Sequence, residues 1–155
     1  MTVSREIGVG DPPLFEGLQQ WHGFLLRKAA QVVTGSVERD LSPLQVTMRQ
    51  FGVLSVVAAE PGLNQRAVGS KLRINRMTVV TLVDKLEGTG LMERRRCPDR
   101  RSLALHLTER GGIRLREAQE VLAEVHREFL SPLSAEERDA LREILVRLVM
   151  CGPGL

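Results

Sequence analysis

Residues 62–111 read GLNQRAVGSKLRINRMTVVTLVDKLEGTGLMERRRCPDRRSLALHLTERG, and this stretch decides the fold. Asn64 and Asn75 are suited to cap two short helices, in which apolar residues recur at helical spacing. In the second helix these residues predict an inner face of Val79, Leu82, Val83 and Leu86. Two short strands are predicted at 91–95 and 103–107, with a polar tip between them. In the second strand Leu103, Leu105 and Leu107 alternate with Ala104 and His106, which predicts one inner and one outer face. Two helices, a short turn and a hairpin in this order predict a winged helix-turn-helix, in which one helix enters a DNA major groove and the hairpin lies beside it.

A second helix start is predicted upstream, at Ser42-Pro43-Leu44-Gln45. Ser42 can cap this helix, Pro43 suits its first position, and Gln45 completes a capping box. The inner face that we expect for this helix consists of Leu44, Met48, Phe51, Leu54 and Ala58.

The remaining helical patterns flank this central part. An apolar stripe begins at Leu14 in steps of three and four and predicts a long helix. After the hairpin, Thr108 can cap a helix that Pro132 ends, and Ser134–Glu137 forms a capping box for the last helix. Because these helices would leave apolar surface exposed on a lone chain, we expect a two-fold homodimer.

The predicted fold class is mainly α with a small β-hairpin wing: a winged helix-turn-helix domain plus N- and C-terminal dimerisation helices. The parts expected are a flexible N-terminal arm at 1–13, a dimerisation helix at 14–40, the winged helix-turn-helix domain at 41–107, C-terminal dimerisation helices at 108–150 and a tail at 151–155.

The basic charge is concentrated in the stretch predicted to read DNA. Residues 64–102 hold ten Lys or Arg against four acids, a net of +6, whereas the rest of the 155 residues carries a net of −3. A phosphate-binding surface needs such a local excess of positive charge. The distribution therefore favours double-stranded DNA as a partner.

Other function classes find little support in the composition. The three His are far apart in the chain, and the two Cys make no metal or disulfide framework. We find no phosphate-binding Gly-rich loop and no nucleophile motif, and therefore expect no enzyme, no cofactor and no metal. No apolar run approaches the roughly 20 residues of a membrane span, and the first residues lack a signal-peptide core. The expected location is the cytoplasm.

Several phrases resemble the MarR family of transcriptional regulators, named for multiple antibiotic resistance. They are Leu41-Ser42-Pro43-Leu44-Gln45, Leu86-Glu87-Gly88-Thr89-Gly90-Leu91, Asp99-Arg100-Arg101-Ser102 and Leu107-Thr108-Glu109-Arg110-Gly111. The resemblance implies a homodimer whose two winged domains bind a pseudo-palindromic operator in adjacent major grooves. It also implies a repressor that a small aromatic ligand releases from DNA.

The sequence departs from the family pattern in and beside the recognition helix. Met77 replaces the usual hydroxyl residue, Val80 and Thr81 stand where Thr and Arg are common, Arg73 where Gly is frequent, and Gly69 where Ala is usual. Because contacts to base edges specify sequence, the operator cannot be inferred from the family.

The candidate DNA contacts come from three places. The start of the first helix supplies phosphate ligands, the second helix supplies base contacts, and the wing supplies Arg for the minor groove. The candidates are Asn64, Gln65, Arg66, Arg73, Asn75, Arg76, Met77, Thr78, Thr81, Arg94, Arg96, Asp99, Arg100 and Arg101.

A ligand pocket is predicted from the first two helices. Its candidate residues are Trp21, His22, Phe24, Arg27, Met48 and Phe51, with Arg27 as the partner of a ligand carboxylate. Two alternatives remain open. One is a redox-sensing regulator that acts through Cys97, whose Arg-rich surroundings would lower its thiol pKa. The other is a winged-helix protein–protein adaptor without DNA binding.

Overall fold

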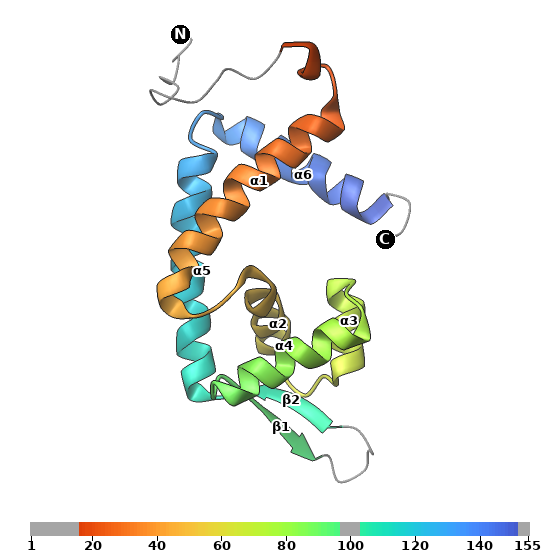
Figure 1. Cartoon of the computed structure of the whole chain (residues 1–155), viewed down its shortest axis with the longest axis vertical. Helices are drawn as coiled ribbons and strands as arrows, with labels where there is room; N and C mark the ends of the chain where they lie inside the picture. The colour runs from red at the N-terminus through yellow and green to blue at the C-terminus, as the bar shows by residue number, and fades with distance from the viewer. Residues whose placement is uncertain (1–15, 97–102, 152–155) are drawn as a thin grey trace. The chain divides into compact units, whose positions relative to one another are not determined.

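The computed structural model describes residues 16–96 and 103–151. The chain forms two compact units. One unit spans 37–124, and the other combines the segments before residue 37 and after residue 124. Two continuous helices, α1 (His22–Leu41) and α5 (Glu109–Phe129), each contribute to both units (Figure 1).

The unit of residues 37–124 contains the predicted helices and hairpin. After the end of α1 and a 3-10 turn, η2 (Ser42–Leu44), its elements are α2 (Met48–Ala59), α3 (Gln65–Leu72), α4 (Arg76–Gly88), β1 (Met92–Arg96), β2 (Leu103–Leu107) and most of α5. One aliphatic core joins them, and its fully buried members include Val53, Leu54, Val57, Val68, Val83, Leu86 and Leu105. The predicted fold class is confirmed, with helices packed around a two-stranded antiparallel hairpin.

The hairpin is tied to this unit by backbone hydrogen bonds on both sides. Leu105 N donates to the carbonyl of Leu63 at 2.8 Å, and Gly62 N donates to the carbonyl of Leu105 at 2.9 Å. At its base, Thr108 N donates to the carbonyl of Leu91, and the Thr108 hydroxyl donates to the carbonyl of Gly90 at 2.7 Å. The wing is therefore built onto the core rather than attached by its ends alone.

The predicted helix start at Ser42–Gln45 is wrong. Ser42–Leu44 forms one 3-10 turn, and Gln45 ends it with a left-handed φ of 55°. Helix α2 begins at Met48, because the Thr47 hydroxyl accepts from Gln50 N and the Gln50 side chain accepts from Thr47 N, which completes a capping box.

The predicted inner face of α2 changes with its start. Met48 and Ala58 are exposed rather than buried, and Leu44 is only half-buried. Val53, Leu54 and Val57 form the buried face instead. Of the predicted residues, Leu54 alone is fully buried, and Phe51 packs partly buried against the core.

The other predicted boundaries shift less. The first long helix begins at His22, after a 3-10 turn at Glu16–Leu18, and not at residue 14. Strand β1 lies one residue later than predicted, and β2 has the predicted bounds. In β2 the predicted alternation fails at one end, because Leu103 is exposed and Ala104 is buried.

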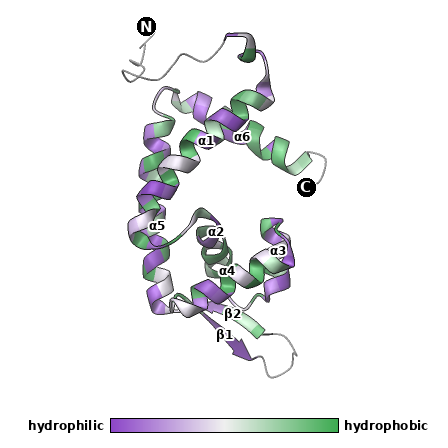
Figure 2. Ribbon diagram, viewed as in Figure 1, coloured by the Kyte–Doolittle hydropathy of each residue, from purple (hydrophilic) through white to green (hydrophobic). Residues whose placement is uncertain are grey.

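The other unit contains η1 (Glu16–Leu18), most of α1, the end of α5 and α6 (Ala135–Cys151). The Ser134 capping box is confirmed: its N–H donates to Glu137 at 2.8 Å and its hydroxyl accepts from Glu137 N at 3.2 Å. No residue of the described helix α6 is buried, although green apolar residues run along it (Figure 2). No described helix is long and apolar enough to cross a membrane.

Candidate nucleic-acid interface

Two asparagines set the starts of the two helices of the helix-turn-helix. The Asn64 side chain accepts a hydrogen bond from Ala67 N at 2.9 Å, and the Asn75 side chain accepts one from Thr78 N at 2.9 Å. Both are N-caps with extended backbone, as the sequence predicted. Their amide oxygens therefore fix where α3 and α4 begin.

The turn between α3 and α4 explains two departures from the family pattern. A Cβ on Gly69 would lie 3.0 Å from Val79 Cγ2 and 3.2 Å from the Ile74 carbonyl oxygen, so Gly69 lets α4 approach α3 closely. Arg73 ends α3 in the left-handed region, with φ 51°, where a non-glycine residue carries strain of about 1–2 kcal/mol. The Arg73 N–H donates to the carbonyls of Gly69 and Ser70, which holds this conformation.

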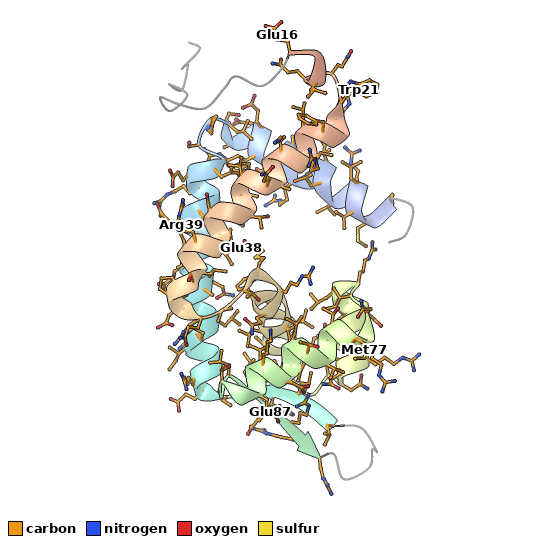
Figure 3. All side chains as sticks on the ribbon, viewed as in Figure 1. Glu16, Trp21, Glu38, Arg39, Met77 and Glu87 are labelled. Atoms are coloured by element: carbon orange, nitrogen blue, oxygen red, sulfur yellow. The ribbon has the colours of Figure 1, made fainter. Side chains whose placement is uncertain are left out.

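Helix α4 has one buried and one exposed face. The predicted inner residues Val79, Leu82, Val83 and Leu86 are all buried, which confirms that prediction. On its first two turns, Arg76, Met77 and Thr81 are exposed and Thr78 is half-buried. Met77, labelled in Figure 3, is 73% exposed.

The exposed face of α4 is partly fixed by internal hydrogen bonding. The Thr81 hydroxyl donates to the Met77 carbonyl at 3.0 Å. Because this bond uses the hydroxyl proton, Thr81 offers a methyl group and oxygen lone pairs to a partner. Beside the cationic Arg76 and the apolar Met77, it completes a surface that suits thymine methyl groups and hydrogen-bonding base edges.

The three arginines of β1 have different surroundings. Arg94 pairs with Asp84 and Glu87 of α4 and is 17% exposed in its side chain, whereas Arg95 pairs with Glu93 of its own strand and is 59% exposed. Arg96 is exposed at the strand end. The predicted contacts Asp99, Arg100 and Arg101, and the candidate redox residue Cys97, lie outside the described residues.

The start of α3 presents a mixed surface. Arg66 is exposed, while Gln65 Nε2 is buried with no hydrogen-bond partner in the described part of the chain. Further along the helix, Lys71 donates to Glu60 at 2.7 Å. Of the three phosphate ligands predicted here, Asn64, Gln65 and Arg66, Arg66 alone has an exposed side chain.

The six residues of the predicted ligand pocket fall in both units. Trp21 immediately precedes α1, and His22, Phe24 and Arg27 lie on its first turns, whereas Met48 and Phe51 lie on α2 in the other unit. The Arg27 guanidinium lies 5.6 Å from the centre of the Phe24 ring. The structure defines no single site that these six residues share.

Two residues beside the candidate interface, Asp84 and Glu87, were not predicted from the sequence. Asp84 and Glu87 stand three residues apart on α4, so they lie one turn apart on the same side, and both meet Arg94. The spacing of these two acids on one side of the helix was the sequence signal that could have predicted a shared cationic partner.

Among residues 16–96 and 103–151, no group of three or more His, Cys, Asp or Glu is placed to hold a metal ion.

The cap at Asn75 gives a first prediction. Asn75→Ala removes the acceptor of Thr78 N, and we expect the free energy of unfolding to fall by about 1 kcal/mol. Asn75→Asp keeps the acceptor oxygen and should retain the stability of the parent chain. Urea unfolding at one fixed protein concentration measures both, and equal stability of the Ala and Asp variants would contradict the capping role.

Comparisons with known proteins point to one family. The model of the MarR family matches residues 46–103. The putative transcriptional regulatory protein for the hcr operon of Thauera aromatica is 33% identical over 128 residues, which cover 81% of this chain and 77% of that protein.

Solved structures agree with this likeness. The transcriptional repressor CouR bound to a 23-mer DNA duplex is 34% identical with a TM-score of 0.81, over 89% of this chain and 99% of that one. CouR from Rhodococcus jostii RHA1 bound to p-coumaroyl-CoA is 25% identical with a TM-score of 0.76, over 91% of this chain and 99% of that one.

Proposed function

Since the chain belongs to the MarR family of DNA-binding transcriptional regulators, we propose that it acts as a homodimeric repressor on a pseudo-palindromic operator. Each protomer would place α4 in a major groove and its wing beside it. The two α4 helices would enter the DNA about one turn apart, or roughly 34 Å.

The exposed face of α4 carries this proposal. Arg76, Met77 and Thr81 stand outward on a helix whose opposite face is locked in the core. Base readout needs such rigid support, because a recognition helix that rocks on its domain loses the geometry of its base contacts. The solved complex of CouR with DNA, at 34% identity, supports the same reading.

Titration with DNA tests the proposal. Fluorescence anisotropy would follow binding to the DNA upstream of the chain's own gene, at several salt concentrations and against a scrambled duplex. We expect selective binding whose log affinity falls linearly with log salt, because bound Lys and Arg release counterions from the phosphates. Equal, weak binding to both duplexes would favour the adaptor alternative.

Arg76→Ala is expected to weaken operator binding by about tenfold or more, because Arg contacts to a base edge or a phosphate contribute about 1–3 kcal/mol. The side chain is exposed, so the melting temperature should stay nearly unchanged. Arg147→Ala removes the same charge from α6 and serves as the control. Similar affinities for these two variants would contradict the assignment of the recognition face.

Release by a small aromatic ligand is the regulatory part of the proposal. The likeness to CouR bound to p-coumaroyl-CoA supports it. A ligand of this kind would act by favouring a dimer in which the two α4 helices no longer match the half-sites. Adding p-coumaroyl-CoA, as the first probe, to the preformed DNA complex should lower the anisotropy.

A further inference from the structure

Arg94 of β1 connects the wing to the recognition helix. Its two terminal nitrogens pair separately with Asp84 and Glu87, which lie one turn apart on α4 (Glu87 is labelled in Figure 3). The planar fork of a guanidinium suits two carboxylates at once, whereas a lysine ammonium is a point charge. One side chain therefore spans from the strand to two turns of the helix.

The position of Arg94 in the hairpin aims it at the protein. Alternate residues of a strand share a face, so Arg94 lies on the same side as Met92, which is 2% exposed. Its partner across the hairpin is Leu105, which is fully buried. Arg95 points to the opposite side and pairs with Glu93 of its own strand.

The electrostatics agree with an internal role. Burial alone would lower the pKa of the Arg94 guanidinium, but the hydrogen bonds and charges of Asp84 and Glu87 outweigh it and raise the pKa. The group is charged at every pH at which the protein folds. Two carboxylates compensate one cation, so this cluster carries no excess positive charge to offer a phosphate.

We propose that Arg94 is a positioning residue that fixes the wing against α4, and that it does not itself bind DNA. This inference rests on the proposed function and replaces the phosphate contact that the sequence suggested for Arg94. Helix and wing must meet two grooves of the same duplex together. Holding their angle in the free protein avoids an ordering cost on binding.

Neutralising the two acids tests the proposal, because a positioning role and simple electrostatics predict opposite changes in DNA affinity. The double variant Asp84→Asn, Glu87→Gln raises the net charge by two, so simple electrostatics predicts tighter DNA binding. A positioning role predicts the opposite, and we expect operator affinity to fall by about tenfold. Glu93→Gln removes the carboxylate that pairs with Arg95 in the same region, and as a control it should bind at least as tightly as the parent.

Arg94→Met, made both in the parent chain and in the Asp84→Asn, Glu87→Gln variant, completes a double-mutant cycle. If Arg94 acts through the acids, Arg94→Met weakens binding about tenfold in the parent chain and adds little in the double variant. A direct phosphate contact would instead cost the same in both backgrounds and lower the slope of log affinity against log salt by about 0.9. That result would overturn the proposal.

A measurement without DNA keeps this inference separate from the proposed function. Amide hydrogen exchange of the free protein should show β1 and β2 exchanging at least tenfold faster in the double variant, with α2 and α3 unchanged. Unchanged exchange of the hairpin would overturn the positioning role. Failure of the parent chain to bind any operator would instead refute the repressor, while the exchange result still decides the role of Arg94.

Discussion

Leu148→Glu is expected to convert the protein into a monomer that binds its operator about a hundredfold more weakly. Helix α6 carries a row of exposed apolar side chains, among them Ile144 and Leu148, which are 44% and 54% exposed, and Val149, which is 63% exposed. A contiguous apolar surface of this kind marks an interface. We infer that a second copy of the chain covers it.

The size of the effect follows from symmetry. A two-fold interface contains the substitution twice, and each buried, unpaired carboxylate costs several kcal/mol. A total of about 4 kcal/mol or more would raise the dimer dissociation constant about a thousandfold. The loss of operator affinity is large because the second winged domain no longer binds at high effective concentration.

Sedimentation velocity and the DNA titration measure the two effects on one sample. Arg147→Gln is the matched control, because it makes the same change in charge at the neighbouring position on the polar side of α6. It should remain a dimer. A Leu148→Glu protein that stays dimeric at micromolar concentration would refute the assignment of this face.

The recognition helix was predictable because several local signals agree. Asn75 caps it, apolar residues recur at helical spacing, and the spacing alone identified all four buried positions. Capping and periodicity act over three or four residues, so they can be read without knowledge of the fold. The Thr108 cap was found in the same way, and Gly111 N donates to its hydroxyl at 3.0 Å.

Two features could not be predicted from the sequence: the start of α2, where two local signals compete, and the role of Arg94, whose partners are distant in the chain. Ser42-Pro43 and Thr47 both resemble helix starts, and the left-handed Gln45 between them decides for Thr47. The role of Arg94 depends on residues seven and ten positions earlier, which only the folded hairpin brings to it. In both cases tertiary structure overrides the local pattern.

Gly111→Ala is expected to destabilise the fold strongly, while Gly112→Ala is not. A Cβ on Gly111 would lie 1.9 Å from the Leu91 carbonyl oxygen and 2.9 Å from its carbonyl carbon. Backbone atoms cannot move aside as a side-chain tip can. The first turn of α5 would have to separate from the base of the wing, where Thr108 N donates to that same oxygen.

The two glycines form a matched pair within one helix. Among the described residues, a Cβ on Gly112 would meet the end of the flexible Arg116 side chain alone, at 3.9 Å. Replacing a helical glycine by alanine gains about 1 kcal/mol where space allows, so Gly112→Ala should be as stable as the parent or slightly more so. For Gly111→Ala the steric cost of about 3 kcal/mol exceeds that gain.

Thermal and urea unfolding at equal protein concentration compare the two variants, because the stability of a dimer depends on concentration. We expect Gly111→Ala to lose about 2 kcal/mol and Gly112→Ala to gain up to about 1 kcal/mol. The displaced Leu91 leads directly into β1, so the Gly111 variant should also bind operator less tightly in its folded fraction. Equal stability of the two variants would show that α5 does not pack closely against the Leu91 carbonyl. The glycine of the Leu-Thr-x-x-Gly phrase would then need another explanation.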